Sequence, residues 1–78
     1  MKLHYYPDTD SLYIELLPGA GTETREVADG LNVDLDASGG VVGFDIDRAS
    51  VRFDLTRLET VDLPIRSPKV AAARAVTI

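Results

Sequence analysis

The feature that most constrains the fold is a pair of alternating segments on either side of a Gly-Gly pair. Residues 31–35 and 42–46 carry apolar side chains at every second position, with polar residues or glycine between them. This period of two places each class of side chain on its own face of a β-strand. The intervening Ala37-Ser38-Gly39-Gly40 favours a turn, and a loop of two or of four residues would preserve the same faces. The segment therefore predicts a hairpin whose apolar face holds Leu31, Val33, Leu35, Val42, Phe44 and Ile46.

Three further strands are predicted before this hairpin. Lys2–Tyr6 and Ser11–Leu17 flank Pro7-Asp8-Thr9-Asp10, whose residue types favour a turn, so they predict a first hairpin. Thr22–Ala28 is more polar, and its charged side chains are typical of a strand at the edge of a sheet. Asp29-Gly30 then predicts a tight turn, because glycine tolerates a positive φ.

The spacing of apolar residues changes after residue 48. Val51, Leu55 and Leu58 recur at intervals of three or four, which predicts a short helix within Ser50–Thr60. Asp54 is a candidate N-cap for this helix. The helix is expected to end before the proline at position 64, because the residue before a proline avoids the helical region.

These segments together predict an α+β, mainly β fold. It is a small antiparallel meander of about five strands, with one short C-terminal helix on or beside its apolar face. Residues 1–63 are expected to form a single compact domain and residues 64–78 a C-terminal tail, in which Val70–Val76 could form a marginal helix. A chain of this length buries only about 60% of its unfolded surface, so additional contacts are expected to stabilise it.

One short helix covers too little area for five strands, so part of the apolar face is expected to stay exposed. Exposed apolar patches are typical of interfaces. We therefore expect a homodimer, formed sheet to sheet or through an edge strand such as Thr22–Ala28. The predicted interface residues are Leu12, Ile14, Val33, Leu35, Phe44 and Ile46.

Composition excludes several classes of protein. The chain has no cysteine, which excludes a disulfide scaffold and a cysteine-ligated metal. Its formal net charge of -5 disfavours nucleic-acid binding, which depends on Lys and Arg. No apolar run approaches the roughly 20 residues of a membrane span, and no basic segment followed by an apolar one opens the chain. We expect a cytoplasmic protein that binds neither nucleic acid nor membrane.

The charge is distributed unevenly along the chain. Residues 1–47 hold 10 acidic and 2 basic residues, a net of -8, whereas residues 48–78 hold 3 and 6, a net of +3. The basic segment could lie beside the acidic sheet of its own chain, which is the favoured interpretation, or could meet the sheet of another subunit. Arg48, Arg52 and Arg57 could likewise recognise an acidic partner or a phosphate, but pairing with Asp45, Asp47 and Asp54 or solvation is favoured.

Paired aspartates on the acidic face are the candidate metal ligands, namely Asp34, Asp36, Asp45 and Asp47. A hard cation such as Ca²⁺ takes roughly six to eight oxygen ligands, of which this cluster could supply some. The spacing of an EF-hand is absent, so a solvated acidic face is the favoured interpretation.

A second candidate site is His4, near Tyr5, Tyr6 and Tyr13, which could take part in acid–base chemistry. A single histidine without a supporting constellation is more often structural. No catalytic residue and no cofactor are therefore assigned.

Four stretches of the sequence resemble a known prokaryotic family, domain of unknown function 2283. Tyr5–Ile14 is similar to its opening motif, Val27–Asp36 and Gly39–Ile46 to its second motif, and Ala49-Ser50 to its usual close. The resemblance covers about residues 3–55. Asp45 stands where members commonly carry Glu, and Tyr6 where Asp is common. The resemblance implies no established activity, catalytic residue or cofactor, but some members resemble small partners encoded beside toxin-like proteins.

The sequence is therefore compatible with two classes of function. The first is a non-enzymatic, self-associating interaction module, with an antitoxin-like role toward another small protein as its most specific form. The alternative is a metal-dependent or small-molecule-processing enzyme that uses the aspartate cluster of the second hairpin. Nucleic-acid binding by the basic C-terminal third is disfavoured by the net charge.

Overall fold

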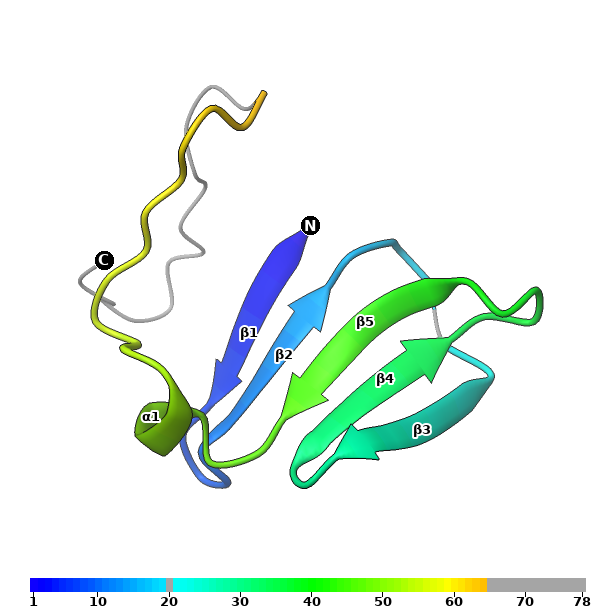
Figure 1. Ribbon diagram of the computed structural model, residues 1–78, viewed down its shortest axis with the longest axis horizontal. Helices are drawn as coiled ribbons and strands as arrows, with labels where there is room; N and C mark the ends of the chain where they lie inside the picture. The colour runs from blue at the N-terminus through cyan, green and yellow to red at the C-terminus, as the bar shows by residue number, and fades with distance from the viewer. Residues whose placement is uncertain (20, 65–78) are drawn as a thin grey trace.

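A computed structural model describes residues 1–19 and 21–64, which form a five-stranded antiparallel sheet with one short helix (Figure 1). The elements are β1 Lys2–Tyr6, β2 Ser11–Glu15, β3 Glu23–Ala28, β4 Leu31–Leu35, β5 Val41–Ile46 and α1 Ala49–Arg52. The predicted mainly β fold, a five-stranded antiparallel meander with one short helix, is confirmed. Val70–Val76 lies outside the described residues, and the division at residue 63 stays a prediction.

The strands lie in the order β1-β2-β5-β4-β3. Three neighbouring pairs are hairpins between consecutive strands, whereas the segment between β2 and β3 passes β5 and β4 to reach the far edge (Figure 1). Backbone hydrogen bonds fix this crossing. The amide of Leu16 donates to the carbonyl of Val42 at 2.9 Å, and the amide of Thr22 donates to that of Leu35 at 2.8 Å. The crossing places β5 at the centre of the sheet and β3 at an edge, as the polar character of β3 predicts.

Register brings the predicted apolar residues onto one face. Phe44 lies opposite Ile14 on one side and Val33 on the other, and Ile46 lies between Leu12 and Leu31 in the same way. This apolar face is only partly covered. Val33, Val42 and Ile46 are buried, but no large side chain among the described residues is completely enclosed. Of the six predicted interface residues, Val33 and Ile46 are buried, whereas Leu12, Ile14, Leu35 and Phe44 are half-buried.

The β4–β5 turn is held by the Asp36 carboxylate. Its Oδ1 accepts hydrogen bonds from the amide of Ser38 at 2.9 Å and from that of Gly40 at 2.8 Å. The Asp36 amide also donates to the Gly40 carbonyl at 2.8 Å. Leu35 then pairs with Val41 across a register irregularity. The loop between β4 and β5 is 36–40, five residues, so it has neither of the two lengths that the sequence leaves open.

The predicted helix within Ser50–Thr60 is wrong in its extent. Helix α1 ends at Arg52, and Phe53 is already extended, with φ -134° and ψ 154°. Asp54 does not cap a helix. Its carboxylate accepts a hydrogen bond from the Thr56 amide at 3.0 Å and forms a local turn, an alternative that short polar side chains offer the backbone. Within residues 1–19 and 21–64, no helix has the length and apolar character needed to cross a bilayer.

The start of α1 is fixed by Asp10, which belongs to the β1–β2 turn and has a φ of 52°. Its carbonyl accepts a hydrogen bond from the Ala49 amide at 2.9 Å. Its carboxylate accepts the Ser50 hydroxyl at 2.7 Å, the Ser50 amide at 3.1 Å and the Tyr5 hydroxyl at 2.7 Å. The bond from Ser50, followed by that from Tyr5, lowers the pKa of Asp10. Asp10 therefore connects the first turn of the chain to the segment that follows β5.

Two arginines connect the same segment to the β3–β4 turn. Arg48 Nη2 lies 3.1 Å from Asp29 Oδ2, and Arg52 Nη2 donates to the Asp29 carbonyl. Gly30, with a φ of 73°, permits this approach, because a Cβ there would lie 2.8 Å from Arg52 Nη2. Asp29 is thus the acidic residue that Arg48 and Arg52 contact, rather than the predicted Asp45, Asp47 and Asp54. Among the described residues, these basic side chains contact the acidic part of their own chain.

We predict that Asp10→Ala lowers the melting temperature, because it removes the carboxylate that holds Tyr5 and Ser50. Asp8→Ala is the matched control, since Asp8 is an exposed residue of the same turn. The lowered pKa of Asp10 means that its stabilisation is complete above about pH 4 and is lost as pH falls through the folded-state value. Thermal unfolding from pH 7 to pH 2 tests this, and equal melting temperatures for the two variants at pH 7 would contradict it.

Candidate functional site

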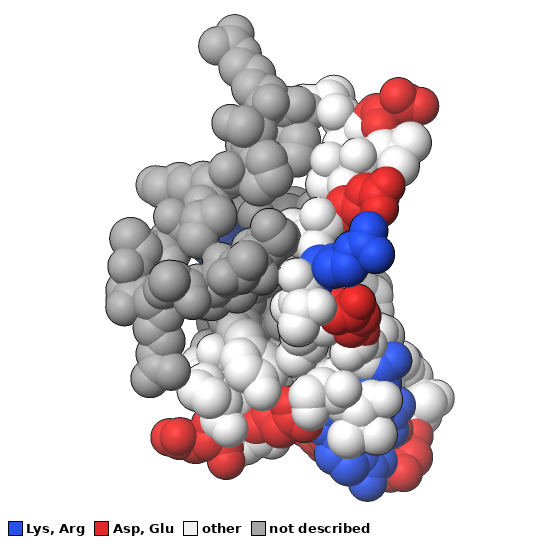
Figure 2. Space-filling view, turned by 90° about the vertical axis from the view of Figure 1, so that its left-hand side faces the viewer, with Lys and Arg blue, Asp and Glu red and all other residues white. Residues whose placement is uncertain are grey.

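The face opposite the apolar one carries most of the polar side chains of the sheet. We call it the polar face. Pairing places Tyr13 between His4 and Asp45, and Asp34 between Thr24 and Gly43. Its residues are Lys2, His4, Tyr6, Ser11, Tyr13, Glu15, Thr24, Glu26, Asn32, Asp34, Gly43 and Asp45. Figure 2 shows acidic and basic side chains interleaved along one margin of the molecule, in a view that also includes residues outside the polar face.

A hydrogen-bonded chain crosses the polar face. The Tyr13 hydroxyl on β2 donates to Asp34 Oδ2 on β4 at 2.9 Å, so the ring spans β5. The other carboxylate oxygen, Asp34 Oδ1, accepts from the Thr24 hydroxyl on β3 at 2.7 Å. Burial, followed by the bond to Asp34, raises the pKa of Tyr13, which therefore stays a neutral donor at neutral pH. These three side chains connect the β1–β2 hairpin to strands β4 and β3.

Gly43 makes the path of Tyr13 possible. A Cβ at this position would overlap Tyr13 Oη and would lie 2.7 Å from Tyr13 Cζ and 3.0 Å from the Ile14 carbonyl. Glycine inside a strand often marks such a close approach. The residue is buried beneath the ring and fixes where the ring lies.

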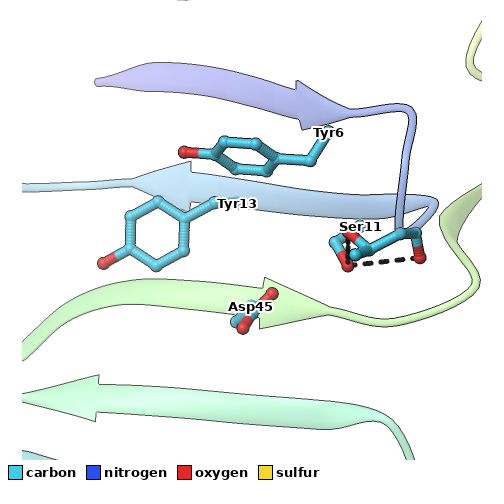
Figure 3. A pocket seen from close by; sticks show the side chains of 5 residues that line it. Tyr6, Ser11, Tyr13 and Asp45 are labelled. Carbon is cyan, nitrogen blue, oxygen red and sulfur yellow. Dashed lines mark hydrogen bonds between the residues drawn. The ribbon is translucent and has the colours of Figure 1, made fainter.

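Beside Tyr13 the polar face is hollowed into a shallow depression of about 410 Å³. Its lining residues are Tyr6, Thr9, Ser11, Tyr13 and Asp45. The Tyr6 ring, the Tyr13 ring, Ser11 and Asp45 surround it from strands β1, β2 and β5 (Figure 3). The Thr9 hydroxyl donates to Ser11 Oγ at 2.9 Å and orders the turn side of the depression.

Asp45 is the charged residue of this depression. Partial burial, followed by the negative charges of Asp47 and Asp34, raises the pKa of its carboxyl group. Within residues 1–19 and 21–64, its carboxylate takes part in no hydrogen bond and no ion pair. It therefore differs from Asp34, whose two oxygens both accept hydrogen bonds.

The predicted histidine–tyrosine group is only partly assembled. His4 stacks on Tyr6 with ring centroids 6.5 Å apart, and lies 6.4 Å from Tyr13 at a tilt of 45°. Tyr5 points to the other face, where it binds Asp10. His4 Nε2 is 3.9 Å from Glu15 Oε1. The rings of His4, Tyr6 and Tyr13 thus form an aromatic cluster on the polar face. They do not form a pair of nucleophile and base.

The structure separates the four candidate metal ligands. Asp34 and Asp45 share the polar face, whereas Asp36 holds the β4–β5 turn and Asp47 follows β5 as an exposed residue. Among the described residues, no group of three or more His, Asp or Glu side chains could hold a metal ion. In the part of the chain that the structure describes, the arrangement therefore offers one unpaired carboxylate with the rings of Tyr13 and Tyr6 on one side of it, not a set of several oxygen ligands.

Sequence reasoning missed the roles of Gly43 and Thr24. Gly43 interrupts an alternating strand at a position where a polar side chain is expected, and such a glycine is itself a signal of close approach. No comparable signal connects Thr24 with Asp34, because their contact depends on the pairing of β3 with β4.

Comparison with known proteins gives one family. The model of a family described as protein of unknown function (DUF2283) matches residues 2–50, which confirms the resemblance seen in the sequence. No curated protein and no solved structure gave a match.

We predict that Gly43→Ala destabilises the fold by about 1–3 kcal/mol, the usual range for overpacking, because the new methyl group displaces the Tyr13 ring. Urea unfolding measures the loss. The control is a double-mutant cycle with Tyr13→Ala: the Gly43→Ala penalty should shrink when the ring is absent. An equal penalty in both backgrounds would show that the Ile14 carbonyl, not Tyr13, sets the requirement.

We also predict that Asp45→Asn raises the melting temperature at pH 7. The raised pKa shows that the charged carboxylate is disfavoured in the folded state, and the amide removes that charge. The penalty is complete above the folded-state pKa and fades as pH falls toward about 4, so the gain over wild type should shrink over the same range. A lower melting temperature for Asp45→Asn at pH 7 would contradict this.

Proposed function

The chain belongs to the DUF2283 family of unknown function, and we propose that it acts as a self-associating protein-interaction module. The observation that carries the proposal is the incomplete core: no large side chain among the described residues is fully buried. Apolar side chains are exposed at both margins of the sheet: Leu3 is 49% and Tyr5 45% exposed on β1, and Val27 is 59% exposed on β3. Contact with a second copy would remove this surface from water.

The two edges of the sheet differ in their fitness for such contact. On β3, Glu23 and Arg25 form an ion pair, and the register shifts between Glu26 and Ala28. Charges and bulges of this kind discourage the addition of a strand. On β1, five residues pair with β2 in unbroken register, and Lys2 is the one charged residue. The proposed contact is therefore β1, rather than the Thr22–Ala28 edge that the sequence suggested.

A two-fold pairing of β1 with β1 of a second copy fits this edge. If the axis passes His4, antiparallel register places Leu3 opposite the copy's Tyr5 on the apolar side and Lys2 opposite its Tyr6 on the polar side. Such a self-complementary contact is the usual geometry of a symmetric dimer. It would join the two apolar faces, including the half-buried Leu12 and Ile14 of the neighbouring strand.

The enzyme alternative receives less support from the geometry, because its four aspartates are dispersed. The family resemblance supports a second small protein as biological partner, in an antitoxin-like role, and the composition supports a cytoplasmic location. Affinity capture from the native cell, followed by mass measurement of the intact complex, tests the partner. A tagged chain recovered only with itself would contradict the antitoxin-like role and leave self-association standing.

We predict that Leu3→Lys weakens the dimer at least about tenfold, a change of 1.4 kcal/mol or more, because it places a charge in the proposed contact. Val27→Lys is the matched control, since Val27 is 59% exposed on the opposite edge strand. Sedimentation at 1–100 µM, taken as a range on the order of expected dissociation constants, measures both variants. Wild-type protein that is monomeric throughout would contradict self-association. A dimer lost with Val27→Lys but retained with Leu3→Lys would contradict the choice of β1.

A further inference from the structure

We propose that the depression on the polar face binds an organic cation, the ammonium or guanidinium group of a lysine or arginine side chain of a partner protein. The site consists of the Asp45 carboxylate, the rings of Tyr6 and Tyr13 and the hydroxyls of Thr9 and Ser11 (Figure 3). It lies on the face opposite the apolar residues, and it shares Tyr6 of β1 with the proposed dimer contact.

The first argument is the unpaired state of Asp45. Asp10, Asp34 and Asp36 each accept two or more hydrogen bonds from side chains or backbone amides of the described residues. The Asp45 carboxylate accepts none there, although it is half-buried. A partly buried carboxylate without a partner is disfavoured, and a cation from outside would relieve the penalty.

The second argument is the aromatic surroundings. Tyr13 lies directly opposite Asp45, and Tyr6 lies opposite Ser11 on the adjoining strand pair. The hydrogen bond from Tyr13 to Asp34 and the absence of a side chain at Gly43 hold the Tyr13 ring in place before any ligand arrives. Ammonium and guanidinium groups are attracted to the faces of aromatic rings, most strongly when a site is partly desolvated.

The third argument is the charge of the polar face. Its acidic residues are Glu15, Glu26, Asp34 and Asp45, whereas Lys2 is its one basic residue, at the far end of β1 from Tyr6. The exposed Asp47 adds a further negative charge beyond β5 and contributes to the raised pKa of Asp45. The resulting potential attracts cations in general.

The lining of the site favours an organic cation over a metal ion. Asp45 is the one carboxylate in the lining, and a hard metal ion needs several oxygen ligands around it. Two rings and two hydroxyls instead suit a cation that combines an apolar stem with a charged head. The depression is open and shallow, so it fits the end of a side chain presented by another surface rather than an enclosed small molecule.

The test is an NMR titration of ¹⁵N-labelled full-length protein with N-acetyl-lysine methylamide and N-acetyl-arginine methylamide. A single side chain should bind weakly, with a dissociation constant on the order of millimolar. We expect saturable shifts of the Tyr6, Ser11 and Asp45 amides. The neutral control probe is N-acetyl-lysine methylamide acetylated at Nζ, which keeps the stem and loses the charge.

Two variants separate the site from general electrostatics. Asp45→Asn should weaken binding at least about fivefold, whereas Glu26→Gln, which removes one charge from the same face on β3, should change it less than about twofold. Equal shifts with the neutral probe, equal binding by Asp45→Asn, or equal losses in both variants would overturn the proposal. Saturation by Ca²⁺ or Mg²⁺ in place of the organic cations would also overturn it. Because Asp45→Asn is expected to be the more stable protein, lost binding would not reflect unfolding.

Discussion

The structure depends on the carboxylate of Asp10. It lies in the first turn of the chain, yet it binds Tyr5 before it and Ser50 forty residues after it. The Ala49 amide bonds to the carbonyl of the same residue, and the Ala49 side chain is fully buried at this junction. Arg48 and Arg52 then hold α1 against the β3–β4 turn. Both hairpin turns at this end of the sheet are thus connected by four helical residues that could not form a stable helix alone.

Asp10 and its partner Ser50 both lie within the family match. Asp10 belongs to the opening motif, Tyr5–Ile14, and the family model ends at residue 50. The contact of Asp10 with Ser50 joins the β1–β2 turn to α1, while the sheet stays open with β1 and β3 at its edges. The matched region is therefore the part of the chain that the Asp10 network, the five strands and the Tyr13–Asp34–Thr24 chain hold together.

The two faces of the sheet are organised in different ways. The apolar face depends on non-directional burial, in which Phe44 and Ile46 are central because β5 has neighbours on both sides. The polar face depends on directed hydrogen bonds, and the Tyr13 ring reaches across β5 because position 43 has no side chain. The first arrangement tolerates many apolar residues of suitable volume. The second requires particular residues at particular positions.

Local features of the fold could be predicted from the sequence. Alternation fixed the faces of β4 and β5, Asp29-Gly30 marked a turn, and the charges of 22–28 marked an edge. The order of the strands could not be predicted in this way, because the pairing of β2 with β5 depends on contacts distant in the sequence. The helix boundary failed for a similar reason: Asp10 sets its start from forty residues away, and Asp54 satisfies the Thr56 amide in a local turn. Of the candidate site, Asp45 and the tyrosines could be singled out, but only the register shows which of them meet.

The central position of β5 has a consequence for biosynthesis. The strands that flank β5 are β2 and β4, and both emerge from the ribosome before it does. Until residue 46 has left the exit tunnel, the β1–β2 hairpin has no sheet to join, and an isolated two-stranded hairpin is only marginally stable in water. The sheet of the nascent chain therefore cannot be completed before β5 is available, because β5 joins β2 to β4.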